Sequence, residues 1–218
     1  MSLSAFLAVL VLLLFVAPSF GARDGNGRSV AVDVVFTALL ISGVAAISVG
    51  RSIRIALAVL VVAATVVRWG SFPPGATAAA GLVSIAAMAL VVLAQAFRGG
   101  PVTVHRVQGA VAAFLLLGLA WSLAYDLVAS YDAGAFTGPA SAAGDGTRFA
   151  YFSFVTLTTV GYGDVTPVHP AARSLAMAEA LTGQLYPAIL LARLVSLSTA
   201  GESSLPPGWN PPAKPGQS

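Results

Sequence analysis

Charged side chains and cysteine are both scarce in this chain. Only 9% of its 218 residues are charged, and none is a cysteine. A soluble domain carries about 25% charged residues, so this chain has too little charge to cover a surface that faces water. The lack of cysteine excludes a disulfide framework, a cysteine-ligated zinc site and thiol catalysis. A net charge of +3 gives no basic footprint for nucleic acid, which leaves an integral membrane protein.

The hydrophobic residues, which make up 57% of the chain, gather in six apolar runs. The runs cover residues 3–17, 30–49, 53–69, 76–97, 107–129 and 171–199. A helix needs about 20 residues to cross the hydrocarbon core, so the first and third runs are short. The first run could also belong to a signal peptide, but no Lys or Arg precedes it, which favours a retained helix. The predicted fold class is an all-α membrane protein with six transmembrane helices.

A shorter apolar segment, residues 147–158, lies between the fifth and sixth runs. It is too short to cross a membrane, which is typical of a re-entrant or buried element. A loop rich in Gly, Ala, Ser and Asp precedes it at residues 130–146. Residues 201–218 are rich in proline and cannot bury a core, so we expect this tail to be disordered.

The most informative motif runs from Thr158 to Asp164 and reads Thr-Thr-Val-Gly-Tyr-Gly-Asp. Its two glycines, separated by one residue, reach backbone conformations that a Cβ forbids, so successive carbonyls can turn the same way. Such a file of oxygens can replace the water shell of a dehydrated cation, and Thr159 can add a hydroxyl oxygen. Val160 and Tyr162 would point away and pack against their surroundings. Irregular backbone at membrane depth is tolerated where it lines an aqueous path.

This motif resembles the selectivity filter of the potassium channel family, whose signature is Thr-Val-Gly-Tyr-Gly. The resemblance implies a passive, K+-selective channel with K+ as its permeant ion, no cofactor and no enzymatic activity. The ion-binding residues it implies are Thr158, Thr159, Val160, Gly161, Tyr162 and Gly163. Those that would coordinate K+ are Thr159, Val160, Gly161 and Tyr162. One filter segment per chain cannot close a ring, so the family's fourfold pore implies a homotetramer.

The resemblance also divides the chain into three parts. These are a four-helix N-terminal transmembrane domain at 1–98, a pore domain at 99–200 and a disordered cytoplasmic tail at 201–218. In the pore domain, residues 107–129 would be the outer helix, residues 147–158 the pore helix and residues 171–199 the inner helix. A potassium filter opens outward, so both termini are expected in the cytoplasm. We expect a multi-pass protein of a prokaryotic cell membrane, surrounded by lipid.

Three side chains are predicted to support the filter: Asp164, Tyr151 and Glu179. We expect Asp164 to bind the Tyr151 hydroxyl or a backbone amide, although a Tyr151 that only packs is an equal alternative. Glu179 lies about 12 Å along its helix, level with the pore helix, and an intramembrane carboxyl is a candidate functional group. We expect it to brace the pore helix through Ser153, Thr156 or Tyr151, as a neutral or hydrogen-bonded group.

The expected inner helix contains three candidate gating or cavity residues. Gly183 lies where the family often places a hinge glycine, but it could equally serve close helix packing. Pro187 removes one backbone hydrogen bond and favours a static kink. Gln184 is expected to face the aqueous cavity, because a glutamine turned toward lipid would be costly. Near the cytoplasmic end of this helix, Arg193 is expected to reach toward lipid headgroups.

Charges that could sense voltage are missing from the fourth apolar run. The third run has only Arg54 and Arg68, which lie near its ends. Each charge that moves across the membrane couples about 2.3 kcal/mol per 100 mV, so we predict weak or no voltage dependence. The aspartates, in contrast, would gather at the outer mouth and enrich cations there. These outer residues are Asp24, Asp33, Asp126, Asp132, Asp145 and Asp164.

Three alternative functions stay open at this point. A non-selective cation channel would usually alter the Val-Gly-Tyr-Gly run, which is intact here. A non-conducting regulatory subunit would not need an intact filter. A component of a potassium-uptake transporter is disfavoured, because such transporters carry four filter-like loops in one chain.

Overall fold

The computed structural model describes residues 3–12, 14, 30–46, 50–97, 103–138 and 146–202. These residues form seven helices and one pair of short strands. The helices are α1 (Leu3–Val11), α2 (Val30–Ala46), α3 (Arg51–Trp69), α4 (Pro74–Ala96), α5 (Val104–Tyr131), α6 (Gly146–Leu157) and α7 (Pro170–Glu202). The strands β1 (Phe136–Thr137) and β2 (Thr166–Pro167) pair antiparallel. The chain is thus mostly helical, as predicted.

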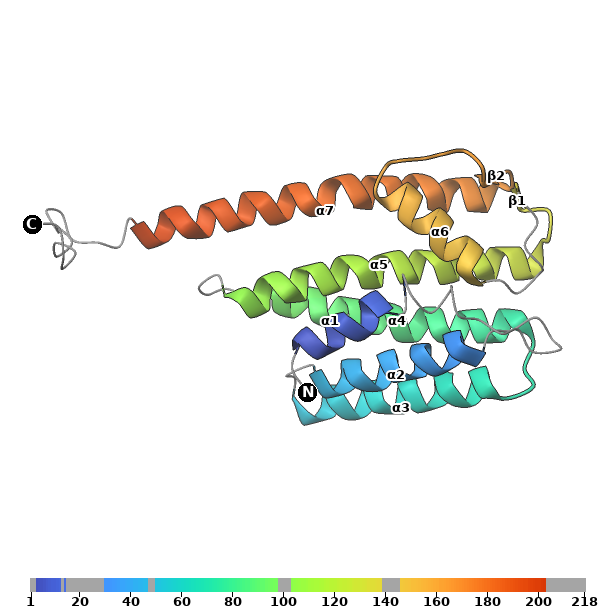
Figure 1. Ribbon diagram of the computed structural model, residues 1–218, viewed down its shortest axis with the longest axis horizontal. Helices are drawn as coiled ribbons and strands as arrows, with labels where there is room; N and C mark the ends of the chain where they lie inside the picture. Colours follow the sequence, from blue (N-terminus) through green and yellow to red (C-terminus); the bar gives the residue numbers. More distant parts are fainter. Residues whose placement is uncertain are drawn as a thin grey trace, which may run out of the picture.

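The long helix α5 lies at the centre of the arrangement (Figure 1). α4 packs along one side of it, and α6 and α7 pack on the other side. The helices α1, α2 and α3 join α4 and α5 around an apolar core, in which Leu39, Ile85, Met88 and Leu116 are completely buried. A second core lies where α5, α6 and α7 meet β1, and its aromatic rings pack edge to face. These two cores hold α5 in place, and α5 in turn positions α6 and α7.

Four of these helices are long and apolar enough to cross a membrane. They are α3, α4, α5 and the Pro170–Arg193 part of α7. The second predicted span forms the shorter apolar helix α2, of 17 residues. In the first predicted span, the described residues form the nine-residue helix α1, which is about 14 Å long. The count of six transmembrane helices is therefore not confirmed in the described residues.

Several expectations fall on residues outside the described ranges. They concern Asp24, Asp145, residues 15–17 of the first apolar run, and residues 203–218 of the tail. The helix α7 continues through residue 202, two residues past the start predicted for the tail at residue 201, and the division into three parts stays a prediction. A helix end cannot be read to within two residues from apolar content alone, since its last turn can be polar.

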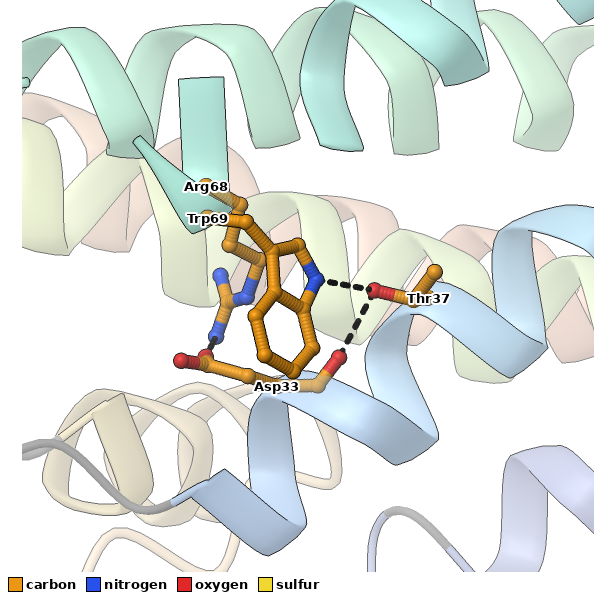
Figure 2. A network of polar contacts seen from close by, with 4 residues as sticks. All are labelled: Asp33, Thr37, Arg68 and Trp69. Carbon is orange, nitrogen blue, oxygen red and sulfur yellow. Dashed lines mark hydrogen bonds and ion pairs between the residues drawn. The ribbon is translucent and has the colours of Figure 1, made fainter. Parts of the chain in front are cut away.

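A polar network ties the start of α2 to the end of α3 (Figure 2). Arg68 forms an ion pair with Asp33 at 2.6 Å, and its guanidinium also lies 4.4 Å from the centre of the Phe36 ring. Trp69 donates its indole N–H to the Thr37 hydroxyl at 3.1 Å. Both side chains of the ion pair are largely shielded from water. Arg68, one of the two candidate sensing charges of the third run, is thus bound to a neighbouring helix.

Breaking this ion pair is expected to destabilise the fold. Exposed ion pairs contribute about 0–1 kcal/mol and breaking buried ones costs about 3–5 kcal/mol, so Asp33→Asn should lower the free energy of unfolding by about 1–3 kcal/mol. Thermal melting of the detergent-solubilised protein measures the loss. Asp132→Asn, at an exposed carboxylate, is the matched control. An equal drop in melting temperature for both variants would contradict a stabilising role for the pair.

Candidate ion-conducting site

The site is built around α6 and the loop that follows it. α6 starts near the β1–β2 end of the molecule and points back toward its middle, where it ends at Leu157 (Figure 1). The chain then returns to the β1–β2 end as an irregular loop beside α7. We call residues 158–163 of this loop the filter segment. This out-and-back path is the re-entrant geometry expected for an apolar helix too short to span.

The last turn of α6 holds the start of the filter segment through backbone hydrogen bonds. The amide of Thr159 donates to the carbonyl of Thr156 at 2.9 Å. The carbonyl of Val155 accepts two amides, from Val160 at 3.0 Å and from Gly161 at 3.2 Å. Helix-terminal carbonyls that have no partner within the helix are therefore used to fix the loop. The position of α6 thus sets the position of the filter segment.

The filter segment alternates between two backbone conformations. Thr159, Gly161 and Gly163 have positive φ, at 62°, 56° and 77°, and the residues between them do not. Alternation of this kind lets successive carbonyls turn to the same side. Among the described residues, Thr159 is the one non-glycine residue with positive φ. A β-branched residue in this conformation is strained, and such strain gathers at functional sites.

The whole filter segment is exposed in the isolated chain. Val160 and Tyr162 have exposed fractions of 54% and 72%. The expectation that these two side chains pack against their surroundings is therefore not met within one chain. Exposed apolar side chains on an ordered loop form a surface that another molecule could cover.

Asp164 closes the filter segment and has two hydrogen-bond partners. The Tyr151 hydroxyl donates to its Oδ2 at 2.8 Å, and the amide of Val165 donates to its Oδ1 at 3.0 Å. Both partners considered in the sequence, the tyrosine and a backbone amide, are thus engaged. The hydrogen bond to Asp164 raises the pKa of the Tyr151 hydroxyl, because it favours the protonated form that donates. Their role in supporting a filter stays a prediction.

The chain after the filter segment is tied to the loop that precedes α6. Phe136 pairs with Pro167, and Thr137 pairs with Thr166, in the short sheet. Gly138, with φ at 121°, lies so close to the carbonyl of Asp164 that a Cβ there would overlap it. These contacts anchor the far end of the loop, as the end of α6 anchors its start.

Glu179 of α7 is completely buried behind α6. Its Oε1 lies 2.5 Å from the Oγ of Ser153 of α6, and its Oε2 accepts a hydrogen bond from Tyr125 of α5 at 2.5 Å. Ser153, one of three partners expected from the sequence, does contact Glu179. Tyr125 was missed, because a tyrosine within an apolar run gives no sign of its partner until the rotation of its helix is known. We call Tyr125, Ser153 and Glu179 the carboxyl bracket.

The three candidate gating residues of α7 lie in different surroundings. Gly183 is buried, and a Cβ built there would overlap the carbonyl oxygen of Leu157 at the end of α6. This favours the packing interpretation of Gly183. Gln184 is exposed, and α7 continues as one helix through Pro187. Arg193 lies over the Phe97 ring and donates to the carbonyl of Phe97, so its guanidinium has a protein partner at the end of α4.

The C-terminal part of the chain matches known proteins. Residues 113–200 match a protein family model described as "Ion channel". Protein LctB of Geobacillus stearothermophilus is 48% identical over 61 residues, which are 26% of this chain and 45% of that protein. Two pore potassium channel c of Oryza sativa subsp. japonica is 48% identical over 46 residues, which are 21% of this chain and 10% of that protein. No solved structure matches the chain.

The matched region contains most of α5 and all of α6, the filter segment and the carboxyl bracket. Residues 113–200 are thus similar to an ion channel family, and 46 residues of the chain are similar to a potassium channel. The chain spans less than half the length of these relatives. The apolar helices and the channel domain together make this a multi-pass membrane protein.

Proposed function

We propose that this protein is a passive, K+-selective channel whose filter segment coordinates dehydrated K+ through backbone carbonyls. The observation that carries the proposal is the alternation of positive φ at Thr159, Gly161 and Gly163. Such an alternation aims a file of oxygens at one axis, and carbonyl oxygens can replace the hydration shell of K+. The strained threonine supports the proposal, because strain of this kind is retained where a site needs it. Gln184, exposed on α7, would face the aqueous cavity.

The functional unit of this proposal is a homotetramer. One filter segment per chain supplies a single wall of a pore, so four copies are needed for a ring. The exposed side chains of Val160 and Tyr162 support this assembly, because neighbouring chains would cover them. The outward face of α7 is also apolar, with Met177, Leu181 and Leu185 all more than half exposed. Lipid and neighbouring inner helices would share this face.

The proposed channel responds weakly to voltage and lies in the cell membrane with both termini in the cytoplasm. α4 carries no charged residue, and the ion pair of Arg68 with Asp33 would have to break before Arg68 could move. Residues 1–98 would serve as a scaffold, residues 99–200 as the pore and residues 201–218 as a cytoplasmic tail. The aspartates at the filter end would attract cations to the mouth.

Ion flux into liposomes that contain the purified protein tests the proposal. The expected result is K+ uptake far above that of empty liposomes, with Na+ uptake near background. Equal K+ and Na+ fluxes would indicate a non-selective cation channel instead. No flux from protein that has the mass of a tetramer in detergent would indicate a non-conducting subunit. A monomeric mass would contradict the proposed assembly.

The hydrogen bond between Tyr151 and Asp164 is expected to support conduction. Tyr151→Phe removes the donor at the outer end of the filter segment. Exposure to water weakens a hydrogen bond even to a charged group, so we expect K+ flux to fall only by about twofold to tenfold. Tyr131→Phe, at an exposed tyrosine of α5, is the matched control. Equal flux in Tyr151→Phe and wild type would show that Tyr151 only packs.

A further inference from the structure

The carboxyl bracket contains more hydrogen-bonded oxygen pairs than its hydroxyl hydrogens can serve. Tyr125 Oη lies 2.5 Å from Glu179 Oε2, and Glu179 Oε1 lies 2.5 Å from Ser153 Oγ. Ser153 Oγ also lies 2.7 Å from the carbonyl oxygen of Gly118 on α5. Oxygens at these separations need a hydrogen between them, since otherwise their lone pairs repel. The chain of three oxygen pairs therefore needs three hydrogens.

The two hydroxyl groups supply only two of these hydrogens. Tyr125 has one hydrogen for Glu179 Oε2, and Ser153 has one for either Gly118 or Glu179 Oε1. The third hydrogen must come from the carboxyl group itself. A neutral Glu179 donates to Ser153, and Ser153 then donates to the Gly118 carbonyl. Each of the three oxygen pairs then has one hydrogen between its oxygens. The surroundings agree, because Glu179 is completely buried and neither of its partners is a cation, so a charge there would lack compensation.

We propose that Glu179 is held as a neutral carboxylic acid and acts as the positioning residue of the filter, through Ser153. The proposal rests on the proposed channel function. Ser153 lies two positions before Val155, whose carbonyl holds the amides of Val160 and Gly161. A displacement of Ser153 relative to α7 would carry the rest of α6 with it. The Val155 carbonyl, which anchors the filter segment, would therefore move as well. Because the bracket joins α5, α6 and α7, it fixes the depth of α6 against both neighbouring helices.

A pair of substitutions at Glu179 tests this proposal. Glu179→Gln copies the neutral acid, since its amide can donate to Ser153 while its oxygen accepts from Tyr125. We expect K+ flux per assembled channel within about twofold of wild type for this variant. Glu179→Ala leaves both hydroxyl groups without their partner, and we expect about a tenfold or larger loss of flux and a lower K+/Na+ ratio. Ser153→Ala should lower the ratio in the same way.

Infrared spectroscopy measures the protonation state without reference to conduction. A buried neutral acid has a carbonyl stretching band that a carboxylate lacks, and we expect this band in wild type at neutral pH and its loss in Glu179→Gln. Absence of the band in wild type would overturn the proposal, even if Glu179→Ala does not assemble.

The flux measurements supply further outcomes. The wild type could conduct K+ while Glu179→Gln is as inactive as Glu179→Ala. This result would show that a charged carboxylate is required. A Glu179→Ala variant with a lower yield but unchanged flux and selectivity per channel would show a purely structural role. Failure of the wild type itself to conduct K+ would contradict the proposed function, while the infrared band would still test the neutral acid.

Discussion

Gly183→Ala is expected to separate α7 from the end of α6 and to abolish K+ flux. The added Cβ would overlap the carbonyl oxygen of Leu157, and it would lie 2.8 Å and 3.1 Å from the carbonyl carbon and Cα of that residue. Backbone atoms cannot turn aside as a side chain can, so one of the two helices has to move. Overpacking of this kind typically costs about 1–3 kcal/mol. Because Leu157 immediately precedes the filter segment, a displacement of the end of α6 would also shift the proposed ion path.

Gly81→Ala is the matched control for this substitution. Gly81 is also a buried helical glycine, but a Cβ there would lie 3.4 Å from the Leu123 side chain, at ordinary contact distance. This variant should melt at or above the wild-type temperature, because alanine favours a helix over glycine by about 1 kcal/mol. For Gly183→Ala, both the melting temperature and the K+ flux into liposomes should decline. Reduced flux with an unchanged melting temperature would instead favour the hinge interpretation of Gly183.

The path of the channel domain could be predicted closely from the sequence. The pore helix was expected at residues 147–158, and α6 runs from Gly146 to Leu157. The prediction succeeded because both ends carry strong signals, a loop rich in glycine before the helix and the Gly-Tyr-Gly run after it. The helices α3, α4 and α5 begin and end within a few residues of their apolar runs. Long apolar runs are the strongest local signal that a membrane protein offers.

The first apolar run is described only in part, since residues 13 and 15–17 lie outside the described ranges. Its hydrophobic content predicts a span, but the described helix ends at Val11 after nine residues. Apolar content indicates that a segment is buried, whereas the length of the helix also depends on what it packs against. α1 packs on α2 and α5, with Phe6 and Leu10 fully buried between them.

The carboxyl bracket and the packing of Gly183 depend on rotation and register, which sequence periodicity did not provide. Glu179 was expected to brace the pore helix, yet Tyr125 lies 54 positions away in sequence, and its contact follows from how α5 is turned. Leu157 contacts Gly183 through its backbone carbonyl, and a contact of the backbone cannot be predicted from the pattern of side chains. Both contacts cross between helices whose relative depth is set by the tertiary fold.

Gly161→Ala is expected to abolish selective K+ flux through backbone conformation alone. Gly161 has φ at 56°, and a Cβ built there would meet nothing within 4 Å in the isolated chain, so no contact within one chain opposes a methyl group. The left-handed conformation costs a residue with a Cβ about 1–2 kcal/mol. In the proposed tetramer this cost would arise once per chain around a single ring. Relaxation of φ to negative values would turn a carbonyl away from the axis and remove a K+ ligand.

Gly50→Ala is the matched control, because it separates this conformational cost from the addition of a methyl group. Gly50 also has open space around a built Cβ, but its φ is −56°, a value that alanine adopts freely. Flux and the K+/Na+ ratio should match wild type in Gly50→Ala and be lost in Gly161→Ala, while both variants retain the wild-type mass in detergent. Retention of selective flux in Gly161→Ala would mean that the positive φ at this position is not needed for coordination. The filter would then have to bind K+ through oxygens other than the alternating carbonyls, and the main support for the proposed mechanism would be lost.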